Sequence, residues 1–141
     1  MSVFSEKGFS VLGTVAKRGW LSEYAIAKER LTIARPEEVS AIEGIGLPIA
    51  ALTAHKALVD VAGIKLDGSG PRMNILVTAA SGSLGHYVVQ LAKLGNAHVI
   101  GTCGAHNIKF MKSLGADEVL DYKTPQGTTL KSPSGKKYDA A

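Results

Sequence analysis

The fold is decided by Asn74-Ile75-Leu76-Val77-Thr78-Ala79-Ala80-Ser81-Gly82-Ser83-Leu84-Gly85, where a short apolar run passes directly into a glycine-containing turn. Residues 74–79 are almost continuously apolar, which is typical of a parallel strand buried on both faces. Residues 80–85 have the pattern A-x-G-x-x-G. A helix is expected to follow and to end at Gly95. Its apolar face is predicted to consist of Leu84, Val88, Leu91 and Ala92.

Strands and helices continue to alternate after this helix. Residues 97–102 and 118–121 are predicted to be strands, with a helix between them. His106 or Asn107 is expected to cap that helix, whose buried face is formed by Ile108, Met111 and Leu114. The order βαβαβ predicts an α/β fold, namely one mononucleotide-binding half of a doubly wound parallel sheet, a partial Rossmann domain.

The flanking segments are less regular. Residues 9–15, 24–27 and 31–34 are predicted to be short extended segments, and residues 36–40 the start of a helix. A buried, alanine-rich helix is predicted over 47–61, with Ile49, Leu52, Ala57, Leu58 and Val61 at helical intervals. At the other end, residues 124–137 are expected to form a loop, and residues 138–141 to open a fourth strand.

The turn after the first strand is the candidate binding element. A diphosphate is bound by backbone N–H groups at the positive end of a helix dipole. Gly82 would let the backbone approach the phosphates, and Gly85 would let the helix pack closely on the strand. The residues of the turn expected to bind a cofactor are Ser81, Gly82, Ser83, Leu84 and Gly85. The alternative is a plain strand-to-helix turn, but the strand before it and the helix after it favour nucleotide binding.

The end of the second strand favours NADP(H) over NAD(H). NAD-binding domains usually place an Asp or Glu about 20 residues after the turn, on the ribose hydroxyls. Here that place holds Thr102-Cys103-Gly104, so no carboxylate repels a 2′-phosphate. The expected cofactor-binding residues of this segment are Thr102, Cys103, Gly104, His106 and Asn107.

Composition excludes some other classes of protein. The 141 residues are 45% apolar and 20% charged, as in ordinary globular domains, and the net charge of +4 is too mild to indicate a nucleic-acid partner. The single cysteine, Cys103, cannot form an intrachain disulfide, and the four histidines lack metal-ligand spacing, so no metal site is expected. No apolar run is expected to approach the roughly 20 residues of a transmembrane helix.

Several motifs resemble one family. Residues 77–85, followed by Gln90-Leu91-Ala92-Lys93, are similar to the zinc-independent medium-chain dehydrogenase/reductases, and in particular to quinone oxidoreductases. Residues 112–123 fit the same family, and residues 131–139 resemble its plant chloroplast-envelope members. The resemblance covers about residues 20–140, so the chain would be truncated at both ends relative to the family.

The resemblance implies an NADPH-dependent, metal-independent oxidoreductase that reduces quinones or the double bond of α,β-unsaturated carbonyl compounds. It places Thr53 near the nicotinamide and Tyr122 near the adenosine phosphate. It makes residues 1–35 a remnant of a GroES-like substrate domain and residues 36–141 an incomplete NADP(H)-binding domain. No catalytic residue is expected in this chain. The expected location is the chloroplast or its envelope, with peripheral membrane association left open and the cytoplasm as the alternative.

Two other classes of protein are considered as alternatives, and the edge of the sheet leads to an expectation about assembly. A non-catalytic, truncated nucleotide-binding protein would share the same turn, whereas a short-chain reductase is disfavoured because Tyr138 lies too near the end to begin a Tyr-x-x-x-Lys pair. An incomplete sheet exposes an apolar edge, which favours self-association into a homo-oligomer.

Overall fold

The computed structural model describes residues 11–13 and 32–141, and the chain divides into two compact units, residues 1–49 and 50–141. In the first unit, β1 (Val11–Gly13) pairs antiparallel with β2 (Thr32–Ala34). These strands lie within two of the predicted extended segments, whereas the segment 24–27 lies outside the described residues. The assignment of residues 1–35 to a substrate domain stays a prediction.

The first helix, α1 (Ala41–Gly44), begins later than the predicted start at residues 36–40. Its start is set by Ser40: the Ser40 hydroxyl accepts a hydrogen bond from the Glu43 amide (3.3 Å), and the Ser40 amide donates to the Glu43 carboxylate (2.9 Å). This reciprocal pair is a capping box. Pro36 precedes a turn, and the helix begins only after Ser40, where the capping pair forms.

The predicted helix over 47–61 is present as a π-helical turn η2 (Leu47–Ala51), then α2 (Leu52–Lys56) and a second π-helical segment η3 (Ala57–Val61). The prediction that it is buried is wrong. Ala54 and Leu58 are buried, but Ile49, Leu52 and Val61 are 53%, 64% and 83% exposed. Periodicity identified the helix but not its buried face, since Leu58 is the one predicted position that is buried.

The same stretch corrects the expectation about apolar runs. The helical residues Ile42–Val61 form one segment of 20 residues with a mean hydropathy of 1.3, long and apolar enough to cross a membrane by length and composition. This is weak evidence, because helices of water-soluble proteins meet the same criterion.

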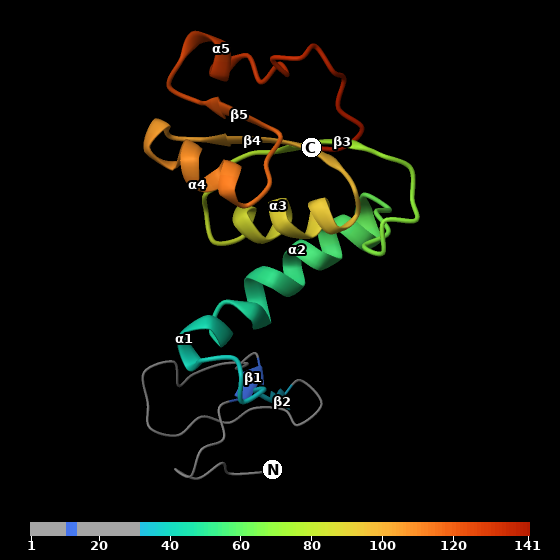
Figure 1. The fold of residues 1–141 in the computed structure, drawn as a ribbon, viewed down its shortest axis with the longest axis vertical. Helices are drawn as coiled ribbons and strands as arrows, with labels where there is room; N and C mark the ends of the chain where they lie inside the picture. Colours follow the sequence, from blue (N-terminus) through green and yellow to red (C-terminus); the bar gives the residue numbers. More distant parts are fainter. Residues whose placement is uncertain (1–10, 14–31) are drawn as a thin grey trace. The chain divides into compact units, whose positions relative to one another are not determined.

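The second unit contains the predicted βαβαβ order. The strands β3 (Asn74–Val77), β4 (His98–Cys103) and β5 (Glu118–Asp121) form a parallel sheet in the order β3-β4-β5. The connections are α3 (Gly85–Leu94) and a 3-10 turn η4 (Ala105–Asn107) that runs into α4 (Ile108–Ser113). Asn107 occupies the N-cap position of α4, but neither its side chain nor that of His106 makes a capping hydrogen bond there. Figure 1 shows α3 and α4 on the same face of the sheet.

The two faces of the sheet are covered unequally. On the helical face, Ile75, Val77 and Val99 pack with Val89 of α3 and Met111 of α4 in the main core. The buried side of α3 is formed by Gly85, Val89 and Ala92, whereas Leu84, predicted to be on that side, is 41% exposed. Leu84 precedes the helix and belongs to the turn. On the opposite face, Leu76, Ile100 and Leu120 form a smaller cluster, which is covered by Tyr138.

The last residues, predicted to open a fourth strand, pair with the free edge of β3 through a single bridge. Ala140 forms a parallel bridge with Ile75, and its carbonyl accepts a hydrogen bond from the Leu76 amide (3.0 Å). The chain thus crosses from β5 to the far side of β3, which reverses the strand order there, as in a doubly wound sheet. The segment 124–137 is not only a loop, as predicted: Thr124 caps a short helix, α5 (Pro125–Thr128), by accepting a hydrogen bond from the Gly127 amide.

Candidate dinucleotide site

The turn between β3 and α3 is closely packed. The Gly82 amide donates to the Ala79 carbonyl (2.9 Å), which closes the turn. A Cβ on Gly85 would lie 2.6 Å from the Ala79 carbonyl oxygen and 2.6 Å from Ala80 Cα. Only glycine allows α3 to start this close to the strand, as the sequence predicted. Ala79 has φ of +48°, an uncommon conformation for alanine, so the turn holds local strain.

Thr102 holds this strained turn from the neighbouring strand. Its hydroxyl accepts a hydrogen bond from the Ala79 amide (3.1 Å), and its carbonyl accepts one from the Ala80 amide (2.8 Å). Thr102 is buried. The sequence suggested Thr102 as a hydroxyl donor to the cofactor, which stays a prediction; its contacts with the turn had no signal in the sequence.

The amides at the start of α3 are left available. Within residues 32–141, the amides of Ser83, Leu84 and Gly85 donate no hydrogen bond to a protein acceptor. They are consecutive N–H groups at the first turn of a helix, where the helix dipole favours an anion. This arrangement is what a diphosphate requires.

A cavity of about 690 Å³ lies beside these amides. It is lined by the turn residues 82–85, by β3 with Thr78 and Ala79, by parts of η3, and by residues 139–141. The cavity therefore lies where the strand order reverses, at the carboxyl end of β3, the usual place for a ligand of an open α/β sheet. Its lining is mostly apolar.

A second group of predicted residues meets at the end of β4. A Cβ on Gly104 would lie 3.1 Å from His106 Cε1 and 3.4 Å from the Tyr122 hydroxyl oxygen, so both rings lie against the Gly104 backbone. His106 and Tyr122 are exposed, and the Asn107 amide donates to the Gly104 carbonyl (2.9 Å). Cofactor-binding residues that were predicted separately, after β4 and after β5, thus lie close together.

Cys103 has a different environment from its neighbours. Its side chain is buried in the main core, and burial, followed by the nearby Asp121 carboxylate, raises the pKa of its thiol. A raised pKa disfavours the reactive thiolate. Asp121 faces Cys103 across the β4–β5 register, so one carboxylate does lie near this end of the sheet. It belongs to β5, where a search along β4 alone would not find it.

Thr53 is the predicted site residue that the structure places apart from the others. It is exposed on α2, and it is not among the residues that line the cavity. The helical segment that carries it packs against α3 within the same unit. Its expected position near a nicotinamide stays a prediction.

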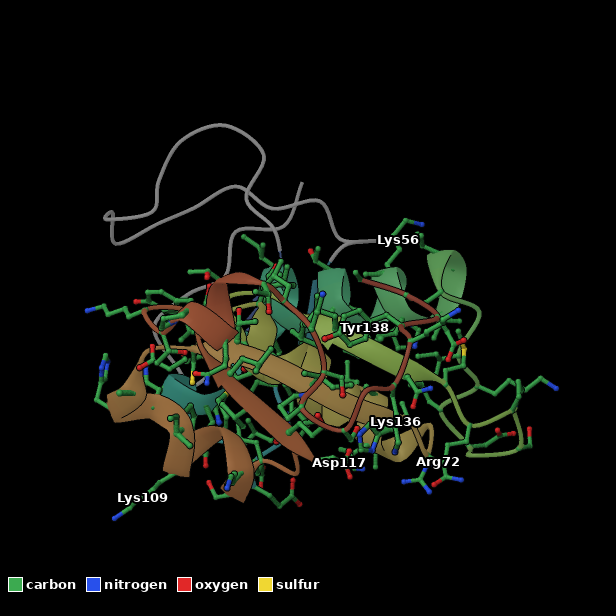
Figure 2. The ribbon with its side chains drawn as sticks, turned by 90° about the horizontal axis from the view of Figure 1, so that it is seen from above. Lys56, Arg72, Lys109, Asp117, Lys136 and Tyr138 are labelled. Atoms are coloured by element: carbon green, nitrogen blue, oxygen red, sulfur yellow. The ribbon has the colours of Figure 1, made fainter. Side chains whose placement is uncertain are left out.

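The amino end of the sheet holds a contrasting cluster of polar groups. Glu118 accepts hydrogen bonds from Ser134, from His98 Nε2 (2.8 Å) and from Ser132 (2.7 Å). Burial opposes its charge, but the bonds from Ser134, His98 and Ser132 outweigh that cost and lower the pKa of Glu118 to about 2. Lys93 Nζ lies 2.9 Å from the Asp117 carboxylate. Figure 2 shows Asp117 at this end of the sheet and Lys109 of α4 projecting from the other.

Comparison with known proteins agrees with this geometry. A family model described as "Zinc-binding dehydrogenase" matches residues 83–141. The chain is 72% identical over 124 residues to the "Quinone-oxidoreductase homolog, chloroplastic" of Spinacia oleracea, and 69% identical over 122 residues to the "Chloroplast envelope quinone oxidoreductase homolog" of Arabidopsis thaliana. These alignments cover 88% and 86% of this chain.

The chain belongs to the quinone-oxidoreductase-like medium-chain dehydrogenase/reductase family. The chain spans 38% and 37% of the length of those two relatives.

Solved structures of this family have the same fold. The quinone oxidoreductase from Coxiella burnetii superimposes with a TM-score of 0.72 at 29% identity, covering 92% of this chain and 40% of that one. The quinone oxidoreductase from Thermus thermophilus, solved also in complex with NADPH, gives 0.70 at 28% identity, covering 83% and 38%. The partial Rossmann fold predicted for this quinone oxidoreductase-like chain is therefore confirmed.

Within residues 11–13 and 32–141, no group of three or more His, Cys, Asp or Glu side chains is arranged so that it could hold a metal ion. The residues around the turn fit a dinucleotide, because amides without a protein acceptor among the described residues adjoin the cavity at the start of α3, and such amides bind a diphosphate.

Proposed function

We propose that this chain binds NADPH as the dinucleotide-binding part of an oxidoreductase that reduces quinones or the double bond of α,β-unsaturated carbonyl compounds. The observation that carries the proposal is that the amides of Ser83, Leu84 and Gly85, beside the cavity at the carboxyl end of β3, have no protein acceptor within residues 32–141. NADPH supplies the hydride in such a reaction.

The residues of this chain bind and orient the cofactor. The amides of Ser83, Leu84 and Gly85 would donate to the diphosphate, with the dipole of α3 behind them. Thr102 holds the turn in place through Ala79 and Ala80. The cluster of Gly104, His106 and Tyr122 would contact the adenosine 2′-phosphate, with Asn107 next to it. No residue is proposed to take part in the chemical step.

The preference for NADPH over NADH rests on the end of β4. No carboxylate follows β4 between Thr102 and Asn107, so a 2′-phosphate meets an imidazole and a phenol hydroxyl. A charge-assisted hydrogen bond to the phosphate would favour NADPH by about tenfold. Asp121 is the carboxylate nearest in register, and its oxygen accepts a hydrogen bond from the Lys123 amide (3.0 Å), which turns part of its charge toward the backbone.

Isothermal titration of the 141-residue chain with NADPH and with NADH tests both parts of the proposal. We expect NADPH to bind about tenfold more tightly. Equal binding of the two would contradict the 2′-phosphate assignment, and binding of neither would contradict the dinucleotide site itself.

Turnover is tested separately, by following NADPH oxidation with a quinone and with an enone in parallel with binding. Turnover would support a reductase. Binding without turnover would support the alternative of a non-catalytic nucleotide-binding protein.

Two further proposals concern location, which rests on the relatives, and self-association, which rests on the edge of the sheet. Since two relatives are named as chloroplastic and one as a chloroplast-envelope protein, we propose the chloroplast or its envelope as the location, which fractionation of tagged protein would test. Because only a single bridge, at Ala140, extends the sheet beyond β3, we also propose that the isolated chain self-associates, which light scattering would test.

A further inference from the structure

One hydrogen bond lies directly behind the free amides. The Nδ1 atom of His86, in the first turn of α3, lies 2.8 Å from the Gly82 carbonyl oxygen. A carbonyl can only accept, so Nδ1 must carry the proton. The His86 amide donates to the same carbonyl at 3.2 Å. The Gly82 oxygen is thus held twice by one residue, once through the backbone and once through the side chain.

This double hold fixes the orientation of a whole peptide unit. The Gly82 carbonyl and the Ser83 amide belong to one planar peptide group, and the peptide bonds of the described residues contain no cis form. In a trans peptide the C=O and the N–H point in opposite directions. Because His86 holds the carbonyl along α3, the Ser83 N–H must point away from the helix, on the side where an anion would bind.

The ring itself is held in place. The centroids of the His86 and Tyr87 rings lie 4.2 Å apart, with the planes inclined by 36°. His86 is partly buried and is not among the residues that line the cavity. It therefore acts on the turn from behind, without touching the space where a ligand would lie.

We propose that His86 is a positioning residue of the phosphate turn: its Nδ1–H locks the peptide between Gly82 and Ser83 so that the Ser83 amide is preset to receive a diphosphate. The inference rests on the proposed nucleotide site, because the preset amide needs an anion to bind. Without the lock, the peptide unit can rotate and must be reoriented at each binding event, which weakens affinity.

Three substitutions of His86 distinguish the role of its N–H donor from the role of its ring. His86→Asn keeps an N–H donor attached to Cγ, where Nδ1 is, but removes the ring. His86→Phe keeps a ring next to Tyr87 but removes the donor. His86→Gln keeps a polar amide but moves its donor one bond further out. The measurement is the dissociation constant for NADPH by titration, with the melting temperature of each variant as a check on folding.

We expect His86→Phe and His86→Gln to weaken NADPH binding by about three- to tenfold, the effect of one hydrogen bond. We expect His86→Asn to remain within about twofold of the unchanged chain. A role in packing alone would be shown if Phe bound NADPH normally, or if Asn were as weak as Phe, and either result would overturn the proposal.

The proposed function and this inference fail in different ways. If the unchanged chain does not bind NADPH, the nucleotide site itself is wrong. If it binds and the Phe, Gln and Asn variants all bind equally, the site stands and the role of His86 is wrong. The amide resonance of Ser83 gives a second readout, since in ligand-free protein it should shift in the Phe and Gln variants and stay near its original position in Asn.

Discussion

At the amino end of the sheet, Glu118 and Asp117 are bound by their neighbours, whereas at the carboxyl end the amides of Ser83, Leu84 and Gly85 have no protein acceptor among the described residues. Both ends belong to the same parallel strands, and both gather polar groups. Groups that pair with each other stabilise the fold, and groups left unpaired at a helix N-terminus are available for a ligand. Substitutions at the amino end should therefore change mainly the free energy of unfolding. Substitutions at the carboxyl end should also change the affinity for NADPH.

The largest effect is expected from Gly85→Ala. The added methyl carbon would lie 2.6 Å from the Ala79 carbonyl oxygen and 2.7 Å from that of Ala80, both backbone atoms that cannot move freely. Overpacking of this kind costs about 1–3 kcal/mol of stability, and displacement of the turn should reduce NADPH affinity by more than about tenfold. Thermal unfolding and NADPH titration measure the two effects.

The matched control is Gly70→Ala, because a Cβ there would meet nothing closer than Lys65 Cβ at 3.6 Å. It should leave both the melting temperature and NADPH binding unchanged. Normal NADPH affinity in Gly85→Ala would show that the turn is not part of the binding site.

The second largest effect is expected from Glu118→Gln, and only in the free energy of unfolding. Glu118→Gln removes a carboxylate that accepts hydrogen bonds from His98, Ser132 and Ser134. Because hydrogen bonds to a charged acceptor are lost, the free energy of unfolding should fall by about 1.5–3 kcal/mol, which urea unfolding measures. The affinity for NADPH should stay the same. Glu38→Gln, at an exposed position, serves as the control. Weakened NADPH binding in Glu118→Gln would contradict the separation of the two ends.

The acid sensitivity of the fold should depend on the same carboxylate. The pKa of Glu118 is lowered from 4.5 to about 2, so the folded state holds the charged form more tightly than the unfolded state. Its contribution is therefore present above about pH 4.5 and is lost as the pH falls through about 2. Asp117, whose pKa is also lowered, although burial opposes this, by the Val99 amide and Lys93, adds to the same loss.

Unfolding free energies measured from about pH 6 down to about pH 2 would check this, in the unchanged chain and in Glu118→Gln. The variant should show a shallower loss below about pH 4.5, because it lacks the titrating group. Identical slopes would mean that Glu118 is not held as described.

A smaller effect is expected from Thr102→Val, which keeps the shape of the side chain but leaves the Ala79 amide without its acceptor. One unsatisfied donor costs about 1 kcal/mol, and a looser turn should weaken NADPH binding by a few-fold. Thr102→Ser keeps the hydroxyl and should retain affinity. If Val and Ser bind equally well, Thr102 does not hold the turn.

Much of this could be predicted from the sequence because it depends on local rules. The apolar run at 74–77, the glycines at 82 and 85 and the short links gave the strand order, and the family resemblance is confirmed. The exposure of Leu52 and Val61 could not be predicted, because it depends on what covers a helix, not on its period. The hydrogen bonds of Thr102 and His86 to the turn could not be predicted from the sequence either, because they depend on side-chain orientations in the folded chain.

The binding claim is tested most directly by the backbone amide resonances of the 141-residue chain during titration with NADPH. The amides of Ser83, Leu84 and Gly85 should shift most and saturate with one affinity, while those of His98 and Glu118 stay nearly unchanged. Shifts concentrated at the amino end of the sheet, or none at the turn at saturating NADPH, would contradict diphosphate binding at the start of α3.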